Sequence, residues 1–105
     1  MTDLATALKT AFLAGNSFVA DTPEGHWYPC GFAWLTYKCR KNAKEAATLK
    51  DNGFRWDDYR KEYTLGAFKW KATQSMDYQI SIVREVQQSL AESGFPQFGV
   101  DSRID

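Results

Sequence analysis

The sequence contains few of the residues that form metal sites, disulfide frameworks or thiol active sites. Its 105 residues include two cysteines, Cys30 and Cys39, and one histidine, His26. A closed zinc site needs four ligands, and the spacing of these three residues, four and then nine positions, matches no zinc pattern. Two cysteines also exclude a disulfide-dense scaffold, although a single bridge remains an open alternative. We therefore expect no metal, no cofactor and a cytoplasmic location, a reducing compartment that suits free thiols.

Long apolar runs and signatures of catalysis are also missing. No stretch approaches the roughly 18 apolar residues of a membrane-spanning helix, and Asp3 lies where a secretory signal would carry positive charge. The sequence has no glycine-rich phosphate loop, no dinucleotide fingerprint and no H-E-x-x-H pattern. Cys30 with His26 lacks a third group that would orient a nucleophile and its base. The sequence thus predicts a protein that is not an enzyme and does not contact membranes. An enzyme that uses Cys30 or the acidic pair Asp57-Asp58 is a distant alternative.

What the sequence does contain is an excess of aromatic residues and an uneven distribution of charge. Four Trp, five Tyr and seven Phe need more burial than a small domain easily supplies, so we expect some rings on a half-exposed face. The net charge is zero, but residues 38–71 hold ten cations and five acids, whereas both flanks are net acidic. This basic centre could steer an anionic partner to one face, or the acidic ends could neutralise it in the fold.

The N-terminal third predicts a helix followed by a small hairpin. Apolar residues recur at helical spacing over residues 3–14, and Gly15-Asn16 supplies a stop. Residues 17–20 predict a short strand, and residues 26–28 predict its return strand after a turn rich in Asp, Pro and Gly.

The clearest strand pattern covers residues 32–39. Alternation places one set of side chains on a core face and the other set on a face that is only partly covered. The core set is Ala33, Leu35, Tyr37 and Cys39, and the other set is Phe32, Trp34, Thr36 and Lys38. The second set mixes large rings with polar groups, which makes this face a candidate contact surface.

A short alanine-rich helix follows this strand. It covers residues 43–52, and Asn42 with Glu45 three positions later forms a capping-box pair. Gly53 predicts a left-handed stop after the helix, with Phe54 packed back on its last turn in a Schellman arrangement.

A hairpin is expected directly after this stop. Residues 54–56 and 61–65 alternate on either side of the polar turn 57–60. Residues 68–71 continue the same alternation after a glycine, which extends the predicted strand pattern.

The last strong element is a long helix from Thr73 or Ser75 to Ser93, and residues 97–105 indicate a frayed C-terminal tail. The predicted fold class is therefore α+β. We expect an antiparallel sheet of about four to five short strands packed by an N-terminal and a long C-terminal helix, with a short central helix. One domain is expected over residues 1–96, followed by the tail.

Part of the centre resembles a known family. Residues 50–57, with the sequence KDNGFRWD, and residues 60–63, with the sequence RKEY, resemble a small domain of unknown function found in phage and plasmid proteins, some of them primase-associated. The similarity covers roughly residues 32–65. This chain departs from the family pattern at Glu62-Tyr63, where the family tends to have an aromatic pair. The resemblance implies a mobile-element setting and assigns no activity and no catalytic residues.

The candidate binding residues form two groups of cations and rings. The first group is Lys38, Arg40, Lys41 and Lys44, which span a strand end and the start of the central helix, where an anion would be favoured. The second group is Arg55, Trp56, Tyr59, Arg60 and Lys61, in which cations can meet phosphates while rings stack on bases. A purely structural interpretation stands beside each group. For the first it is a solvated basic edge. For the second, Gly53 ends the helix, Trp56 packs on it, and Asp57 starts the turn by bonding its own downstream backbone.

Two hypotheses for function follow. The leading one is a non-catalytic accessory protein of phage or plasmid type that binds nucleic acid or a nucleoprotein complex through this basic aromatic surface. The alternative is an inhibitor of a host defence or replication protein that acts through exposed rings without contacting nucleic acid. A net charge of zero argues against strong indiscriminate DNA binding and keeps the alternative open.

Overall fold

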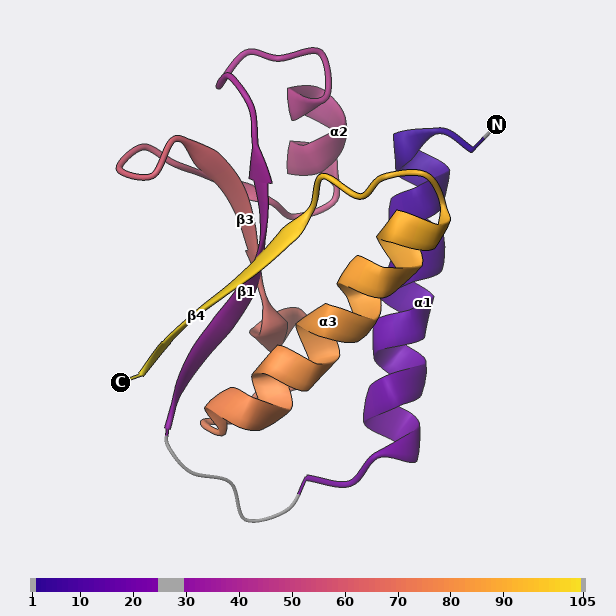
Figure 1. Cartoon of the computed structure of the whole chain (residues 1–105), viewed down its shortest axis with the longest axis vertical. Coiled ribbons are helices and arrows are strands. Elements are labelled where there is room, and N and C mark those ends of the chain that lie inside the picture. The colour runs from indigo at the N-terminus through magenta and orange to yellow at the C-terminus, as the bar shows by residue number, and fades with distance from the viewer. Residues whose placement is uncertain (1, 25–29, 105) are drawn as a thin grey trace.

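The computed structural model describes residues 2–24 and 30–104. Over these residues the chain forms three α-helices and one four-stranded antiparallel sheet, which confirms the predicted α+β class (Figure 1). In chain order the elements are α1 (Leu4–Asp21), β1 (Gly31–Lys38), α2 (Ala46–Asp51), β2 (Arg55–Asp57), β3 (Glu62–Gly66), α3 (Met76–Glu92) and β4 (Gly99–Ile104).

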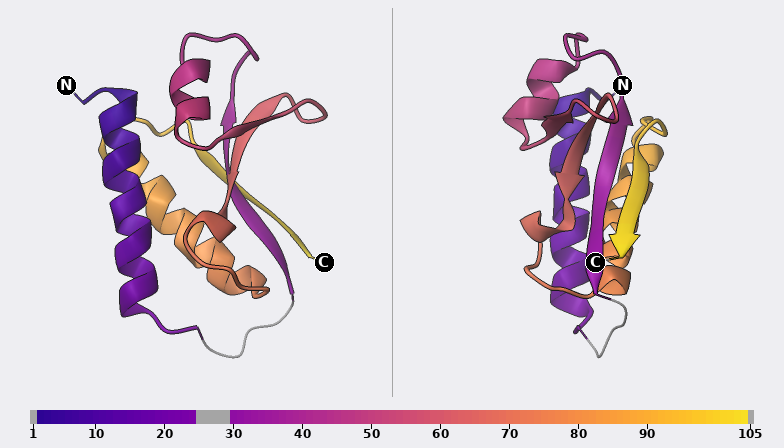
Figure 2. Two further views of the ribbon diagram at one scale, coloured as in Figure 1. Left: turned by 180° about the vertical axis from the view of Figure 1, so that it is seen from behind. Right: turned by 90° about the vertical axis from the view of Figure 1, so that its left-hand side faces the viewer.

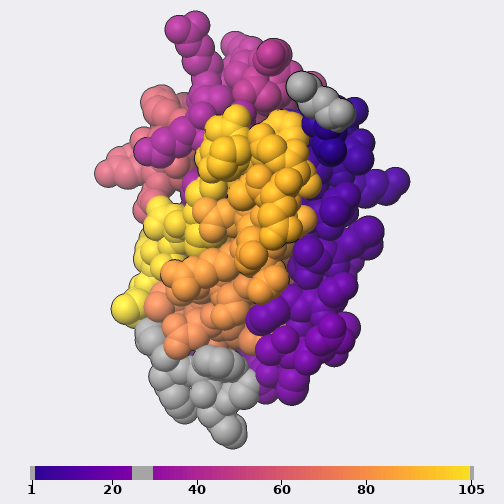
Figure 3. Space-filling model, turned by 45° about the vertical axis from the view of Figure 1, so that its right-hand side comes forward, coloured from indigo at the N-terminus to yellow at the C-terminus, as the bar shows by residue number. Residues whose placement is uncertain are grey.

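The sheet has the strand order β2-β3-β1-β4, and every neighbouring pair is antiparallel. Leu35 of β1 lies opposite Leu65 of β3 and Val100 of β4, so the three strands turn one apolar face to the same side. Both long helices cover this side (Figures 1 and 2). In the space-filling view, α3 lies alongside α1 (Figure 3). The buried core between the helices and the sheet includes Leu8, Leu35, Tyr63, Val83, Leu90 and Phe98.

The first helix is longer than the sequence predicts. α1 continues through Gly15-Asn16, and the strand predicted over residues 17–20 is wrong. Gly15 is buried against Trp70, where an added Cβ would lie 2.5 Å from the indole Nε1. The same Nε1 donates a hydrogen bond to the Phe12 carbonyl at 3.1 Å. Glycine is therefore required here for a close approach and not for a stop. The predicted return strand at 26–28 lies outside the described residues.

Both later helix stops are confirmed. Gly53 has φ 95°, and the Phe54 N–H donates to the Leu49 carbonyl at 3.0 Å, which is the hydrogen bond of a Schellman motif. Gly94 has φ 97° and ends α3 in the same way, with the Phe95 N–H bonded to the Leu90 carbonyl at 2.9 Å.

The start of α2 differs from the prediction. The helix begins at Ala46, and Glu45 is its first flanking residue without a side-chain capping bond, so the capping box with Asn42 is wrong. The Glu45 carboxylate instead accepts a hydrogen bond from the Tyr37 hydroxyl at 2.7 Å. That bond lowers the pKa of Glu45, and burial together with Glu45 raises the pKa of Tyr37 to about 12. The carboxylate is thus engaged by the sheet and not by the helix terminus.

Two further segments near the sheet were predicted wrongly. Residues 68–71 do not extend the hairpin, because Ala67–Lys69 form a 3₁₀ helix with Ala67 buried. The C-terminal segment is not frayed over residues 99–104, which form β4 along the edge of β1. Phe98 anchors this strand, since it is 1% exposed and its ring centre lies 4.7 Å from that of Tyr37.

Candidate nucleic-acid interface

The face of the sheet that points away from α1 and α3 gathers rings and charged groups. Strand pairing places Thr36 beside Thr64, Lys38 beside Glu62, and Trp34 beside Asp101. We call this surface the open face, and its strand residues are Phe32, Trp34, Thr36, Lys38, Arg55, Asp57, Glu62, Thr64, Asp101 and Arg103. The predicted division of β1 into a core face and a partly covered face is therefore confirmed.

Exposed rings mark two places on or beside the open face. Near one end, Phe32 and Phe68 are 42% and 53% exposed, and their ring centres lie 6.1 Å apart. At the tip of the β2–β3 turn, Tyr59 is 93% exposed. Between them, the Arg60 guanidinium lies over the Trp34 ring at 5.4 Å from its centre. Large exposed rings beside cations are typical of surfaces that bind unpaired bases.

The β2–β3 turn is held by its first residue. One carboxylate oxygen of Asp57 accepts hydrogen bonds from the Tyr59 and Arg60 N–H groups at 3.0 and 3.1 Å, as the sequence predicted for this turn. Lys61 completes the turn with φ 57°, in the left-handed region, and its N–H donates to the Asp57 carbonyl at 2.8 Å. The turn therefore presents Tyr59 outward from a fixed backbone.

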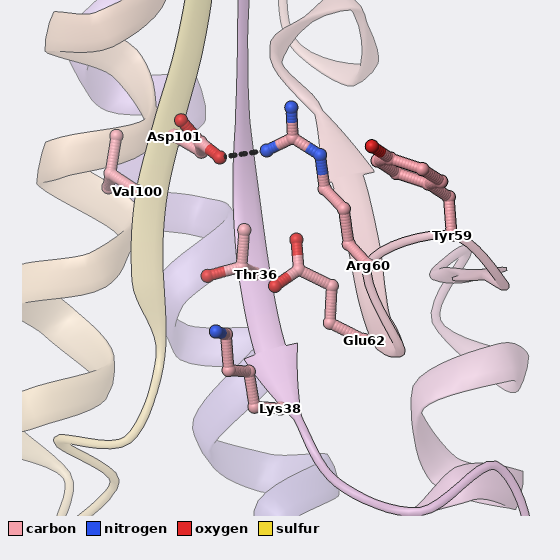
Figure 4. A pocket seen from close by; sticks show the side chains of 7 residues that line it. All are labelled: Thr36, Lys38, Tyr59, Arg60, Glu62, Val100 and Asp101. Atoms are coloured by element: carbon pink, nitrogen blue, oxygen red, sulfur yellow. Dashed lines mark hydrogen bonds and ion pairs between the residues drawn. The ribbon is translucent and has the colours of Figure 1, made fainter.

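The second predicted group of binding residues is divided between the two faces. Arg60 is ion-paired with Asp101 of β4, and its side chain extends across β1 to reach that carboxylate (Figure 4). Lys61 is ion-paired with Asp58 at 3.1 Å. Trp56 lies on the helix side of the sheet, where its ring packs edge-on against Tyr63 with centres 5.0 Å apart.

Trp56 also contributes to the hairpin turn. Its Nε1 donates to the Asp58 carboxylate at 3.2 Å. This bond, the hydrogen bond and charge of Lys61 and the charge of Lys41 all lower the pKa of Asp58. Trp56 is thus placed for packing and for holding the turn, whereas Arg55 and Tyr59 remain exposed.

In the first predicted group, Lys38 ends β1, and Arg40, Lys41 and Lys44 lie in the loop between β1 and α2. Lys44 precedes the helix, so the prediction that this group reaches the first helical turn is wrong, while anion binding by these cations stays a prediction. The loop is tied to the sheet by the Tyr63 hydroxyl, which donates to the Lys41 carbonyl at 2.5 Å. Because Tyr63 is the second residue of β3, this bond holds the Lys41 part of the loop near the β2–β3 turn. The structure therefore brings the two groups together at one end of the molecule.

Five of the nine predicted residues are exposed cations that form no salt bridge with any residue between 2 and 24 or 30 and 104. They are Lys38, Arg40, Lys41, Lys44 and Arg55. Of these, Lys38 and Arg55 lie on the open face, and Arg103, which lies opposite Phe32 on the edge strand, joins them there. The sequence does not indicate Arg103 or Phe68, because its pattern predicts a tail over residues 97–105 and a strand over residues 68–71.

A pocket of about 710 Å³ lies within the open face. It is lined by Thr36, Lys38, Tyr59, Arg60, Glu62, Val100 and Asp101, and Figure 4 shows Glu62 extending from β3 between Arg60 and Lys38. Glu62 is 3% exposed, and its Oε2 has no hydrogen-bond partner among the described residues. Burial raises the pKa of its carboxyl, and the charges of Lys38 and Arg60 oppose part of that shift.

Comparison of the chain with protein-family models, with curated proteins and with solved structures finds no match in any of the three. In the described part of the chain, no group of three or more His, Cys, Asp or Glu residues is arranged to hold a metal ion. Nor does any described helix combine the length and hydropathy that a membrane-spanning segment needs. The open face is therefore the basis for assigning a function.

Proposed function

We propose that this protein binds single-stranded nucleic acid across the open face of its sheet. The observation that carries the proposal is the placement of exposed rings and unpaired cations on the one face that the two long helices leave uncovered. An accessory role in a phage or plasmid setting rests on the resemblance of residues 32–65 alone. No catalytic step is part of the proposal.

Two kinds of contact favour single-stranded nucleic acid over a duplex as the ligand. Phe32, Phe68 and Tyr59 offer ring faces, and only unpaired bases can stack on them. Lys38 and Arg55 lie on either side of β3, where they can contact the phosphates of a strand that crosses the sheet. A duplex would present its backbone to the same surface and leave the rings unused.

The acids on this face limit the strength of binding. Asp57 and Asp101 flank Arg60, so its charge is largely neutralised within the protein. Phosphate contacts therefore depend on the cations without acidic partners. We expect modest affinity and a clear dependence on salt, because each phosphate contact releases counterions.

The test is fluorescence anisotropy with labelled 12-nucleotide DNA and RNA strands and a matched duplex. Arg55→Glu should weaken single-strand binding by roughly tenfold or more at low salt, because it replaces a phosphate contact with repulsion. Lys9→Glu, which makes the same charge change on the exposed side of α1, is the matched control and should have a small effect. Circular dichroism checks that both variants remain folded.

Two results would overturn the proposal. One is the absence of binding to any single strand at low salt. The other is an equal loss of affinity in both charge-reversal variants, which would show that only the total charge matters.

Binding of a host protein is the second candidate, and the exposed Phe32–Phe68 pair is the observation that favours it. Such a partner would contact the rings without using Arg55. A stoichiometric protein that stays bound to the tagged chain after nuclease treatment, and is lost in Phe32→Ala, would favour this candidate if the oligonucleotides fail to bind.

A further inference from the structure

We propose that the pocket around Glu62 recognises one base of the bound strand that carries an exocyclic amino group. The inference rests on the proposed function, which it makes more specific. In this proposal Glu62 accepts a hydrogen bond from the amino group of the base. The residues at the pocket rim hold the phosphate of the same nucleotide and stack on the ring of the base.

Glu62 is built into the sheet in an unusual way. It belongs to β3, and its carboxylate is nearly fully buried while its Oε2 lacks a partner within residues 2–24 and 30–104. Buried polar groups in folded proteins are nearly always hydrogen-bonded, because an unpaired one loses its water without replacement. In Figure 4 the side chain points into the space beside Thr36. The Glu62 carboxylate is thus directed into the pocket.

The charges around the pocket restrict what it can accept. Lys38 and Arg60 line it, so a cationic ligand would be repelled at the point where it approaches Glu62. A free anion would meet Glu62 itself. A neutral group with N–H donors, joined to an anionic group that remains at the rim near Lys38, matches both features. A nucleotide has this combination, and the pocket volume lies in the usual range for small-molecule sites.

Two further residues prepare the site for a base. Tyr59 stands fully exposed at the edge of the pocket and offers a ring face for stacking. Arg60 is held in position by Asp101 and by the Trp34 ring beneath it. The pocket walls are therefore set before a strand arrives.

The amino group is what distinguishes the bases at this site. Cytosine carries an N4 amino donor where thymine carries an O4 acceptor, and carboxylates accept hydrogen bonds from that amino group. The two pyrimidines are otherwise nearly equal in size. A free carboxylate oxygen attracts the donor and repels the acceptor, so Glu62 should favour cytosine.

The test compares 12-mers of deoxycytidine and of deoxythymidine by anisotropy at pH 7.5. The wild-type protein should bind the cytosine strand more tightly by roughly tenfold, the ratio expected for one charge-assisted hydrogen bond. In Glu62→Gln this ratio should fall to about two or less, because the amide offers a donor as well as an acceptor. Glu85→Gln removes the same charge from the exposed side of α3, away from the pocket, and should keep the wild-type ratio.

A change in the strand provides a check that does not depend on folding of a variant. A 12-mer of N4,N4-dimethylcytosine lacks the N4 donors and should bind wild-type protein no more tightly than the thymine strand. Equal binding of the cytosine and thymine strands by wild type, or an unchanged ratio in Glu62→Gln, would overturn the base-recognition inference while leaving the proposed function standing. Failure of every strand to bind would overturn both.

Discussion

The two faces of the sheet each hold a buried polar side chain, and the two side chains differ in what they bind. On the helix side, Gln79 of α3 is 1% exposed and uses its whole amide. Its oxygen accepts from the Ala33 N–H at 2.9 Å, and its nitrogen donates to the carbonyls of Gly31 and Thr73, each at 2.8 Å. On the open side, Glu62 is 3% exposed and its Oε2 binds no described group.

The two faces therefore have different roles: the polar group on the helix side stabilises the fold, and the polar group on the open side is available to contact a partner. The helix side satisfies its polar groups internally, so that α3, β1 and the segment before α3 are fixed to one another. The open side keeps an unpaired acceptor, exposed rings and unpaired cations, which a ligand can pair with or stack on. A surface that keeps unpaired groups at a cost in stability is typical of functional sites.

Removal of the Gln79 amide tests the helix side and should have the largest effect. Gln79→Leu deprives one N–H and two carbonyl groups of their partner, and it should lower the free energy of unfolding by about 2–4 kcal/mol. Gln88→Leu on the exposed surface of the same helix is the matched control, and it should change stability by less than about 0.5 kcal/mol. Urea unfolding followed by circular dichroism measures both. Equal effects in the two variants would mean that the buried amide does not fasten α3 to β1.

How far the sequence predicts these two faces depends on whether the signal is local. The stops of α2 and α3 each rest on a glycine and the residue after it, so the sequence predicts both correctly. The alternation of β1 identified its core and open faces before any partner strand was known. The same alternation in β2 places Trp56 and Arg55 on opposite faces of the sheet. The sequence pattern alone therefore indicates that these two residues of the predicted site cannot share one surface.

The features that the sequence did not predict depend on contacts between distant segments. β4 has no fully buried position, so its pattern shows no clear period, and it becomes a strand because β1 offers an edge. Gly15 continues a helix because Trp70 packs on it from a distant part of the chain. The Arg60–Asp101 ion pair joins the β2–β3 turn to β4, and no local rule indicates it.

That ion pair provides the second test, on the open side. Asp101→Asn should cost less than about 1 kcal/mol of stability, because both partners are about 40% exposed. It should release Arg60 for a phosphate contact, which would tighten single-strand binding by about two- to threefold and make the salt slope steeper by about 0.7. Anisotropy at several salt concentrations measures both quantities. Glu85→Gln on α3 makes the same charge change away from the open face, and an equal gain in affinity there would show that position is unimportant.

The smallest effect is expected for the stability of Glu62→Gln, and its sign depends on pH. Burial raises the pKa of the Glu62 carboxyl above its ordinary value of 4.5, against the lowering effect of Lys38 and Arg60 and together with the charges of Asp101 and Asp57. The folded protein therefore holds this proton more tightly than the unfolded chain does. Its contribution to stability is fully present below the unfolded pKa and is lost as the pH rises through the folded pKa.

Glu62→Gln has no such proton, so its stability relative to wild type should increase between pH 4 and pH 7.5. Other carboxyls titrate in both proteins, and their effects cancel in the difference between the two unfolding curves at each pH. If the difference between the two free energies of unfolding stays constant with pH, burial of the Glu62 carboxylate does not destabilise the folded protein. A difference that increases, and then shrinks when a cytosine strand is bound, would link the unpaired carboxylate on the open face to the ligand that satisfies it.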